Sequence, residues 1–227
     1  MTTAQNRQQA DPWWTGSFHH PFITELAAGT LPLAIFKRYL LQDRYYLQHF
    51  GQIHQAAAEM TDDPHIRALL TDSGDILITG EEAVRATFFR ALGITQQEID
   101  QTPIAPTAYF YVAHMQAQLA GGNVLPVIAG LLPCSWLYLE IGQRLIAQGS
   151  PNPLYQQWIE TYATDTLADS VADYRAILDD QPVPATMQRA IDQAFLISSI
   201  CEYNFWEMAY QDEQWPLAAA QTVVAHG

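Results

Sequence analysis

Apolar residues recur every three or four positions along most of this chain, which is the spacing of an α-helix with one buried face. Strand-like alternation between tight glycine-containing turns does not occur in the sequence. The pattern predicts helices over residues 21–28, 32–60, 62–92, 107–120, 124–147, 154–162, 165–178 and 185–212. Because the breaks between them are short, neighbouring helices should pack antiparallel. We therefore predict an all-α fold, a compact helical bundle.

The length of 227 residues, about half of them hydrophobic, is enough for one sizeable core. We predict a single domain over residues 1–227. A polar leader over 1–16 and a tail over 216–227 are expected to be loosely ordered. Residues 102–106 should form a loop, and Thr107 should cap the helix that follows it.

The formal net charge of −14 argues against binding to nucleic acid or to an anionic membrane surface, because both require a basic patch. Apolar stretches are interrupted by polar residues before the roughly 20 that span a bilayer, and the first residues lack a signal-peptide pattern. A cytoplasmic protein is expected. Its two cysteines, Cys134 and Cys201, should then be free thiols.

Cys134 follows Pro133 inside a stretch that otherwise reads as a helix. Proline inside a helix removes a backbone hydrogen bond and costs roughly 3 kcal/mol, so a chain that keeps it has usually gained a local feature such as a kink. Tyr138 lies one turn further along the same face. The alternative without a functional role is a buried structural thiol beside a tyrosine.

Other polar and aromatic side chains should also turn into the bundle. Asp43 interrupts an apolar run and has Tyr46 three positions on, and Glu202 is related to Phe205 in the same way. The aromatic cluster 109–111 lies just inside a helix start, so at least one of its rings should face inward. A buried carboxylate needs a partner. Two carboxylates, a thiol and several aromatic rings together predict a pocket for a flat, partly polar molecule.

Four segments of the sequence resemble the TenA (thiaminase II) family: 41–47, 106–111, 132–142 and 202–209. Their order and spacing agree from about residue 20 to 215. The resemblance implies a haem-oxygenase-like all-α fold and the cysteine-containing branch of the family. It also implies an aminopyrimidine aminohydrolase of thiamin salvage, which converts 4-amino-5-aminomethyl-2-methylpyrimidine to the hydroxymethylpyrimidine and, in many members, hydrolyses thiamin. No cofactor and no metal are expected.

The resemblance assigns the reaction itself to two residues. Cys134 would be the nucleophile that adds to the pyrimidine ring, and its pKa should be lowered by nearby donors, for which Tyr138 is a candidate. Glu202 would be the proton shuttle. Glu207 is its rival, but it points about 140° away around the helix, so only one of the two can share the pocket with Cys134.

The resemblance assigns the other residues to substrate binding. Asp43 would accept hydrogen bonds from the amino groups of the pyrimidine. Tyr46 and Phe205 would sandwich its ring, while Tyr111 and Tyr162 would supply hydroxyls at the rim. Tyr162 ends a helix and is equally compatible with a place on the surface.

Two other classes of protein stay open. The same fold hosts haem and di-metal oxidases, and the chain has seven histidines, with His19 and His20 near the start of the first helix. A di-iron bundle site uses Glu-x-x-His pairs, which the sequence lacks, and lone histidines in a bundle are usually buried and hydrogen-bonded. A non-catalytic regulatory or binding protein is the other alternative.

The aromatic content predicts a homo-oligomer. Six tryptophans and eleven tyrosines, with Trp13, Trp14 and the segment 206–215 in polar surroundings, exceed what one small core should absorb. The resemblance implies a homotetramer with closed symmetry.

Overall fold

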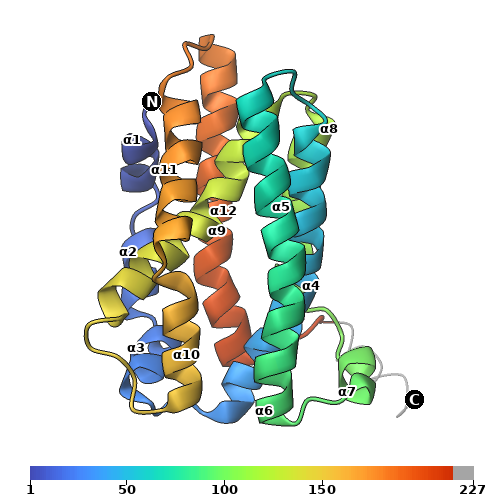
Figure 1. Cartoon of the computed structure of the whole chain (residues 1–227), viewed down its shortest axis with the longest axis vertical. Coiled ribbons are helices and arrows are strands. Elements are labelled where there is room, and N and C mark those ends of the chain that lie inside the picture. The colour runs from blue at the N-terminus through green and yellow to red at the C-terminus, as the bar shows by residue number, and fades with distance from the viewer. Residues whose placement is uncertain (217–227) are drawn as a thin grey trace.

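The computed structural model describes residues 1–216, without the side chains of 81–86, and this part of the chain contains helices and no strand (Figure 1). The helices are α1 (Thr3–Gln9), α2 (Trp13–His19), α3 (Pro21–Ala28), α4 (Leu33–Ala58), α5 (Pro64–Val84), the π-helical turn η1 (Arg85–Phe89), α6 (Arg90–Leu92), α7 (Gln96–Gln101), α8 (Pro106–Ala120), α9 (Val124–Leu145), α10 (Pro153–Tyr162), α11 (Asp165–Asp179) and α12 (Ala185–Gln211). The predicted all-α class is confirmed.

Most of the predicted helices are present with bounds close to those expected. α3 has the predicted bounds, and α4 and α8 to α12 begin and end within two residues of them. The helix predicted over 62–92 is present as α5, η1 and α6 in succession. Thr107 does not cap α8, because the helix begins one residue earlier and Ala105 is its N-cap residue. The Thr107 backbone N–H instead donates to the Glu213 carboxylate.

The prediction of a loosely ordered leader over residues 1–16 is wrong, because this segment forms α1 and most of α2. Thr2 and Gln5 form a capping box at the start of α1. The Asp179 carboxylate of α11 accepts hydrogen bonds from the Thr3 backbone N–H at 2.6 Å and from its hydroxyl at 2.9 Å. Arg7 donates two hydrogen bonds to Glu140 of α9. Tertiary contacts therefore hold two helices that are too short to be stable alone. Most of the predicted tail, 217–227, lies outside the described residues.

α9 is the central helix of the bundle. It packs against α12 most extensively and also against α11, α10, α8 and α4 (Figure 1). Among the described residues it is the one helix long and apolar enough to cross a membrane, with a mean hydropathy of 1.7, but 72% of that apolar window is buried inside the protein. A helix buried in a protein core can be as long and as apolar as a membrane-spanning helix. Cys134 therefore lies on a core helix that packs against five others.

Candidate active site

The eight predicted site residues come from five helices and point toward one region of the bundle. Six are buried, whereas Cys134 and Tyr162 keep partial exposure. We call this set the Cys134 cluster: Asp43 and Tyr46 on α4, Tyr111 on α8, Cys134 and Tyr138 on α9, Tyr162 at the end of α10, and Glu202 and Phe205 on α12. The electrostatic influence of Asp43 and Glu202 reaches both Cys134 and Tyr162, so these side chains share one space.

The Glu202 carboxylate lies at the centre of the cluster. The Tyr111 hydroxyl donates a hydrogen bond of 2.6 Å to Glu202 Oε1, and the Cys134 thiol donates a second. Burial raises the pKa of Glu202 to about 7, while these two donors oppose the rise. At neutral pH Glu202 is therefore close to half protonated, which suits a group that both accepts and returns a proton.

Cys134 is a weaker acid than expected. Burial raises the pKa of the thiol well above its usual range, and the charges of Glu202 and Asp43 raise it further. The nearby Tyr46 hydroxyl opposes this rise in pKa but does not outweigh it. The expected lowering of the pKa is therefore not found in the protein alone. Cys134 also keeps partial exposure deep inside the fold, as a side chain does when it borders an internal space.

The aromatic rings of the cluster touch one another. The centroid of Tyr46 lies 4.8 Å from that of Tyr111 and 5.7 Å from that of Phe205, at an interplanar angle of 60° for the second pair. Two rings that sandwich a third are separated by about two stacking distances, or about 9 Å between centroids. The predicted sandwich by Tyr46 and Phe205 is therefore absent in this conformation.

Tyr138 and Tyr162 belong to a group of phenols centred on a residue that sequence reasoning missed. The hydroxyl oxygen of Tyr39 lies 3.3 Å from that of Tyr138, and Tyr39 also hydrogen-bonds Tyr162. The Tyr138 hydroxyl is paired with that of Tyr39 and not with the Cys134 thiol, so the expected donor role of Tyr138 is not seen in this conformation. Tyr39 precedes Asp43 by four positions and so shares its helix face, a spacing that was visible in the sequence.

A close backbone contact positions Tyr162 inside the bundle. Cys134, Tyr138 and Gly142 are spaced four apart and lie along one face of α9. A Cβ atom on Gly142 would lie 2.6 Å from the carbonyl carbon of Tyr162 and 2.9 Å from the backbone nitrogen of Ala163. Only glycine allows the end of α10 to come this close to α9, and this approach directs Tyr162 inward rather than to the surface.

Glu207 lies outside the cluster. It accepts a hydrogen bond of 2.8 Å from His20 Nε2, and its side chain is 45% exposed. His20 Nδ1 accepts from the Phe22 backbone N–H at the start of α3, so both ring nitrogens of His20 are in use. His49 and His54 bond backbone carbonyls of their own helix. The geometry thus places Glu202, and not Glu207, beside Cys134.

Among the described side chains, those of residues 1–80 and 87–216, no group of three or more His, Cys, Asp or Glu is arranged to hold a metal ion. The side chains that gather around Cys134 are mostly tyrosines, with two carboxylates. Such a set offers hydrogen bonds, proton transfer and aromatic contact to a bound molecule.

Nearly the whole chain is similar to known proteins. Residues 7–212 match the model of the TENA/THI-4/PQQC family. The chain belongs to this family. A TENA/THI-4/PQQC relative named aminopyrimidine aminohydrolase, from Bacillus subtilis (strain 168), is 36% identical over 96% of this chain and 93% of its own length. The resemblance to the TenA family that motifs 41–47, 106–111, 132–142 and 202–209 suggested is thus confirmed.

Solved structures show the same architecture. A TenA homologue from P. horikoshii OT3 has a TM-score of 0.84 and 27% identity, covering 92% of this chain and 98% of its own. A domain of unknown function with a haem-oxygenase-like fold, from Shewanella denitrificans, has a TM-score of 0.73 at 12% identity and covers 93% of both chains. The predicted haem-oxygenase-like fold is therefore confirmed.

Proposed function

We propose that this protein is an aminopyrimidine aminohydrolase of thiamin salvage. It converts 4-amino-5-aminomethyl-2-methylpyrimidine and water to the hydroxymethylpyrimidine and ammonia. One observation carries the proposal: a thiol and a carboxylate with a pKa of about 7, Cys134 and Glu202, are in contact inside a buried aromatic space. A relative that this chain matches over 93% of the relative's length is named aminopyrimidine aminohydrolase.

The proposed reaction uses Cys134 as a covalent catalyst. Its sulfur adds to the ring carbon next to a ring nitrogen, the thiol proton passes to Glu202, and Glu202 passes a proton to the ring nitrogen. The exocyclic amine is held in its protonated, ammonium form, so when its bond to the exocyclic carbon breaks with the electron pair going to nitrogen, neutral ammonia departs. Water adds at the exocyclic carbon as a hydroxyl, and its other proton is released and balances the one that ammonia took away. Loss of the sulfur restores the aromatic ring and returns the proton to the Cys134–Glu202 pair.

The high pKa of Cys134 is compatible with these reaction steps. The thiol does not need to be ionised before the substrate binds, because Glu202 is in contact with it and has a pKa close to neutral pH. Proton transfer between the two can accompany the attack on the ring. The nucleophile would then be generated only where a substrate is present, and a buried thiolate beside two carboxylates would not have to persist.

The remaining cluster residues bind the pyrimidine in this proposal. Asp43 accepts hydrogen bonds from the amino groups and favours protonated forms of the substrate. Tyr111 orients Glu202 through its 2.6 Å hydrogen bond. Tyr46 and Phe205 each offer one ring face, and they must separate if both are to stack on the substrate. Tyr162 contributes its hydroxyl at the rim.

Product formation tests the proposal directly. Purified protein is incubated with 4-amino-5-aminomethyl-2-methylpyrimidine, and ammonia and hydroxymethylpyrimidine are quantified. We expect both products in equal amounts, and a fall in kcat by a factor of about 10² to 10⁴ in Glu202→Gln. Glu207→Gln is the control on the same helix and should keep its activity. The absence of both products from the wild-type protein would refute the function.

We also propose that the protein is cytoplasmic and forms a homotetramer. Trp14 and Trp206, which first suggested an interface, are completely buried in the core instead. The exposed large side chains are others, including Ile76 at 61%, Phe110 at 56% and Tyr109 at 54%. Aromatic residues are enriched at interface cores. Light scattering should give a mass of about four chains, and a mass of one chain would refute the tetramer.

A further inference from the structure

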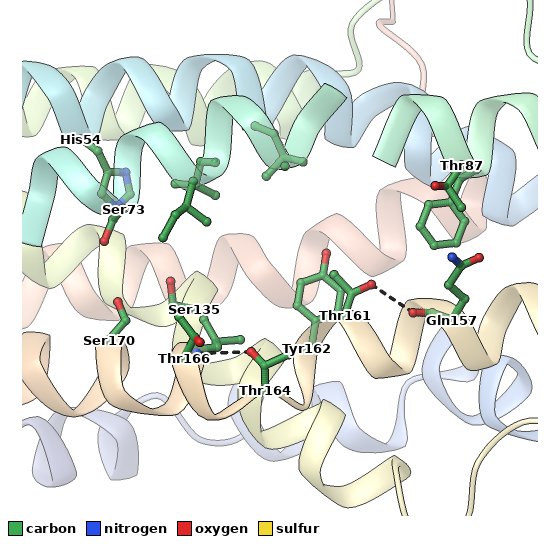
Figure 2. A pocket seen from close by; sticks show the side chains of 16 residues that line it. His54, Ser73, Thr87, Ser135, Gln157, Thr161, Tyr162, Thr164, Thr166 and Ser170 are labelled. Atoms are coloured by element: carbon green, nitrogen blue, oxygen red, sulfur yellow. Dashed lines mark hydrogen bonds between the residues drawn. The ribbon is translucent and has the colours of Figure 1, made fainter. Parts of the chain in front are cut away.

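The Cys134 cluster has two sides that are built differently. On one side, Tyr162 borders a groove of about 450 Å³ between α5 and α11, which is lined in part by threonine and serine hydroxyls (Figure 2). We call it the α5–α11 groove. On another side, Tyr111 comes from α8, which packs against α4, α9 and α12. The position of α8 therefore determines where the Tyr111 hydroxyl lies, and with it the 2.6 Å hydrogen bond to Glu202.

The first turns of α8 present only small side chains to the core. Ala105 and Ala108 are the buried residues that precede Tyr111. The large side chains of this stretch, Tyr109 and Phe110, are 54% and 56% exposed. Because an alanine side chain buries little apolar surface, packing does little to fix this end of the helix. Other contacts must hold the start of α8 if Tyr111 is to stay in place.

A side chain of α4 holds the loop that leads into α8. Gln42 is buried, and both ends of its amide form hydrogen bonds. Its Nε2 donates to the Pro103 carbonyl at 3.0 Å, and its Oε1 accepts from the Ala105 backbone N–H at 2.9 Å. Ala105 is the N-cap residue of α8 and provides no side-chain cap. Gln42 thus fixes two backbone groups immediately before the helix.

The segment that follows α12 holds the same helix start from a second direction. The Glu213 carboxylate accepts from the Thr107 backbone N–H at 2.9 Å, and the Trp215 indole N–H donates to the Ile104 carbonyl at 2.7 Å. This junction lies at the end of the bundle near α7 (Figure 1). α12 also carries the carboxylate that Tyr111 hydrogen-bonds. The helix of the donor and the helix of the acceptor are therefore joined at a second point.

Arg38 attaches this segment to α4. Its Nη1 donates to the Ala209 carbonyl at 2.6 Å, and its Nε lies 2.8 Å from Asp212 Oδ1. Arg38 and Gln42 are four positions apart and so share a face of α4, next to the face that carries Asp43. One rigid helix thus supports both the substrate-binding carboxylate and the start of α8. We call the side chains at this junction the α8 clamp: Arg38, Gln42, Glu213 and Trp215.

The α8 clamp has no room for a substrate. The cavity that Arg38, Gln42 and Glu213 line has a volume of about 50 Å³, well below the roughly 300 Å³ at which small-molecule sites begin. A role of these side chains in the reaction must therefore be indirect, through the helix that they hold.

We propose that Gln42 and Glu213 are positioning residues, which hold the start of α8 so that the Tyr111 hydroxyl stays on the Glu202 carboxylate. The proposal rests on the proposed function and deepens it, because Glu202 is the proton shuttle there. Without either contact, backbone N–H groups at the start of α8 lose their acceptor and the helix start loosens. The ionised form of Glu202 is then less well stabilised by Tyr111, so the pKa of Glu202 rises further.

Glu202 faces titratable groups from several helices, and Tyr111 is the contribution of α8. Hydrogen bonds from Tyr111 and Cys134 lower the pKa of Glu202, although burial raises it more. The charge of Glu202 also acts on three phenols and a second thiol: Tyr46 on α4, Tyr138 on α9, Tyr162 on α10 and Cys201 on α12. Since these groups lie on other helices, a displacement of α8 should reach Glu202 through Tyr111.

The first experiment follows the pKa of Glu202 without turnover. Gln42→Met keeps the length of the side chain and removes both hydrogen bonds to the loop. The free energy of unfolding in urea is measured from about pH 4 to about pH 9, with and without Glu202→Gln. Because the folded pKa of Glu202 is raised, its stabilising contribution is present at low pH and is lost as the pH rises to that pKa. The pH at which the difference stops changing therefore reports the pKa.

We expect this pH to be higher by about half a unit or more in Gln42→Met than in wild type. Gln55→Met is the matched control, because Gln55 lies on the same helix and its exposed amide bonds Asp75 instead. Glu213→Ala should raise the pKa as Gln42→Met does. Glu213→Gln should not, because its amide oxygen can still accept from the Thr107 backbone N–H.

A double substitution separates positioning from a general loss of stability. Tyr111→Phe alone should raise the pKa of Glu202. In this background Gln42→Met should raise it no further, because the hydrogen bond through which Gln42 acts is already gone. A shift of the same size with and without Tyr111 would overturn the proposal. An unmoved pKa in both Gln42→Met and Glu213→Ala would overturn it as well.

Turnover distinguishes this proposal from the proposed function. The limb of the pH–rate profile that reports Glu202 should move with the pKa when aminomethylpyrimidine is the substrate. A shifted pKa in Gln42→Met, with no product from wild type, would support the α8 clamp and reject the aminohydrolase. Product from wild type, with the same pKa in wild type, Gln42→Met and Glu213→Ala, would reject the clamp and keep the aminohydrolase.

Discussion

Replacement of Glu202 by glutamine should change how the stability of the protein depends on pH. Burial raises the pKa of Glu202 from 4.5 to about 7 in the folded protein. Between these two pH values the folded state binds more protons at this carboxyl than the unfolded state does, so stability falls as the pH rises. At about 1.4 kcal/mol for each pH unit, the full loss is about 3 kcal/mol and is complete above about pH 7.

Glutamine at position 202 does not titrate, and its side-chain carbonyl can still accept the hydrogen bond from Tyr111. The free energy of unfolding of Glu202→Gln minus that of wild type should therefore increase by about 3 kcal/mol as the pH rises across this range. Urea unfolding followed by circular dichroism, at one protein concentration and at pH values from about 4 to about 8, measures the difference.

A control separates this effect from a general change in charge. Glu59 is exposed at the end of α4, and Glu59→Gln should give a stability curve parallel to that of wild type. If the curve of Glu202→Gln is also parallel to that of wild type, burial does not raise the pKa of the Glu202 carboxyl as we infer. In that case the proton-shuttle role assigned to Glu202 loses its physical basis.

Three further substitutions test the assigned roles. Cys134→Ser should abolish turnover and leave the circular dichroism spectrum unchanged, whereas Cys201→Ser should stay active; appreciable activity of Cys134→Ser would exclude the covalent route. Asp43→Asn should raise KM more than it lowers kcat, and an unchanged KM would argue against substrate contact by this carboxylate. Tyr111→Phe removes a charge-assisted hydrogen bond of about 2 kcal/mol, so the limb of the pH–rate profile that reports Glu202 should move to higher pH by about 1.5 units; an unmoved profile would contradict the coupling.

The periodic pattern of the sequence was sufficient to predict the long helices. Their apolar faces repeat over several turns, and residues such as Gly93 and Asn123 mark their ends with local signals. The short helices α1 and α2 carry too few turns for such a pattern. They are stabilised by contacts with distant parts of the chain, such as that of Thr3 with Asp179. Such contacts cannot be predicted from the residues of the short helices themselves.

The sequence predicted that the eight side chains of the Cys134 cluster would gather in one region, but it did not point to Tyr39 or give the orientation of the rings. Helical spacing placed Asp43 with Tyr46 and Glu202 with Phe205, and the resemblance to the TenA family suggested their roles. Ring orientation does not follow from spacing, which is why the expected sandwich differs from the tilted contact in the structure. The α5–α11 groove is formed by helices far apart in the sequence, and its lining hydroxyls resemble ordinary surface residues until α5 and α11 are brought face to face.

The contact at Gly142 makes the width of the site depend on a position that touches no substrate. A single methyl group there would collide with the backbone at Tyr162, and the end of α10 would have to move outward. Such a movement would carry the Tyr162 hydroxyl away from Asp43 and would enlarge the passage between the Cys134 cluster and the α5–α11 groove. Laboratory evolution toward bulkier substrates therefore has a route through Gly142→Ala, in which one added carbon atom changes the entrance while every reacting group stays in place.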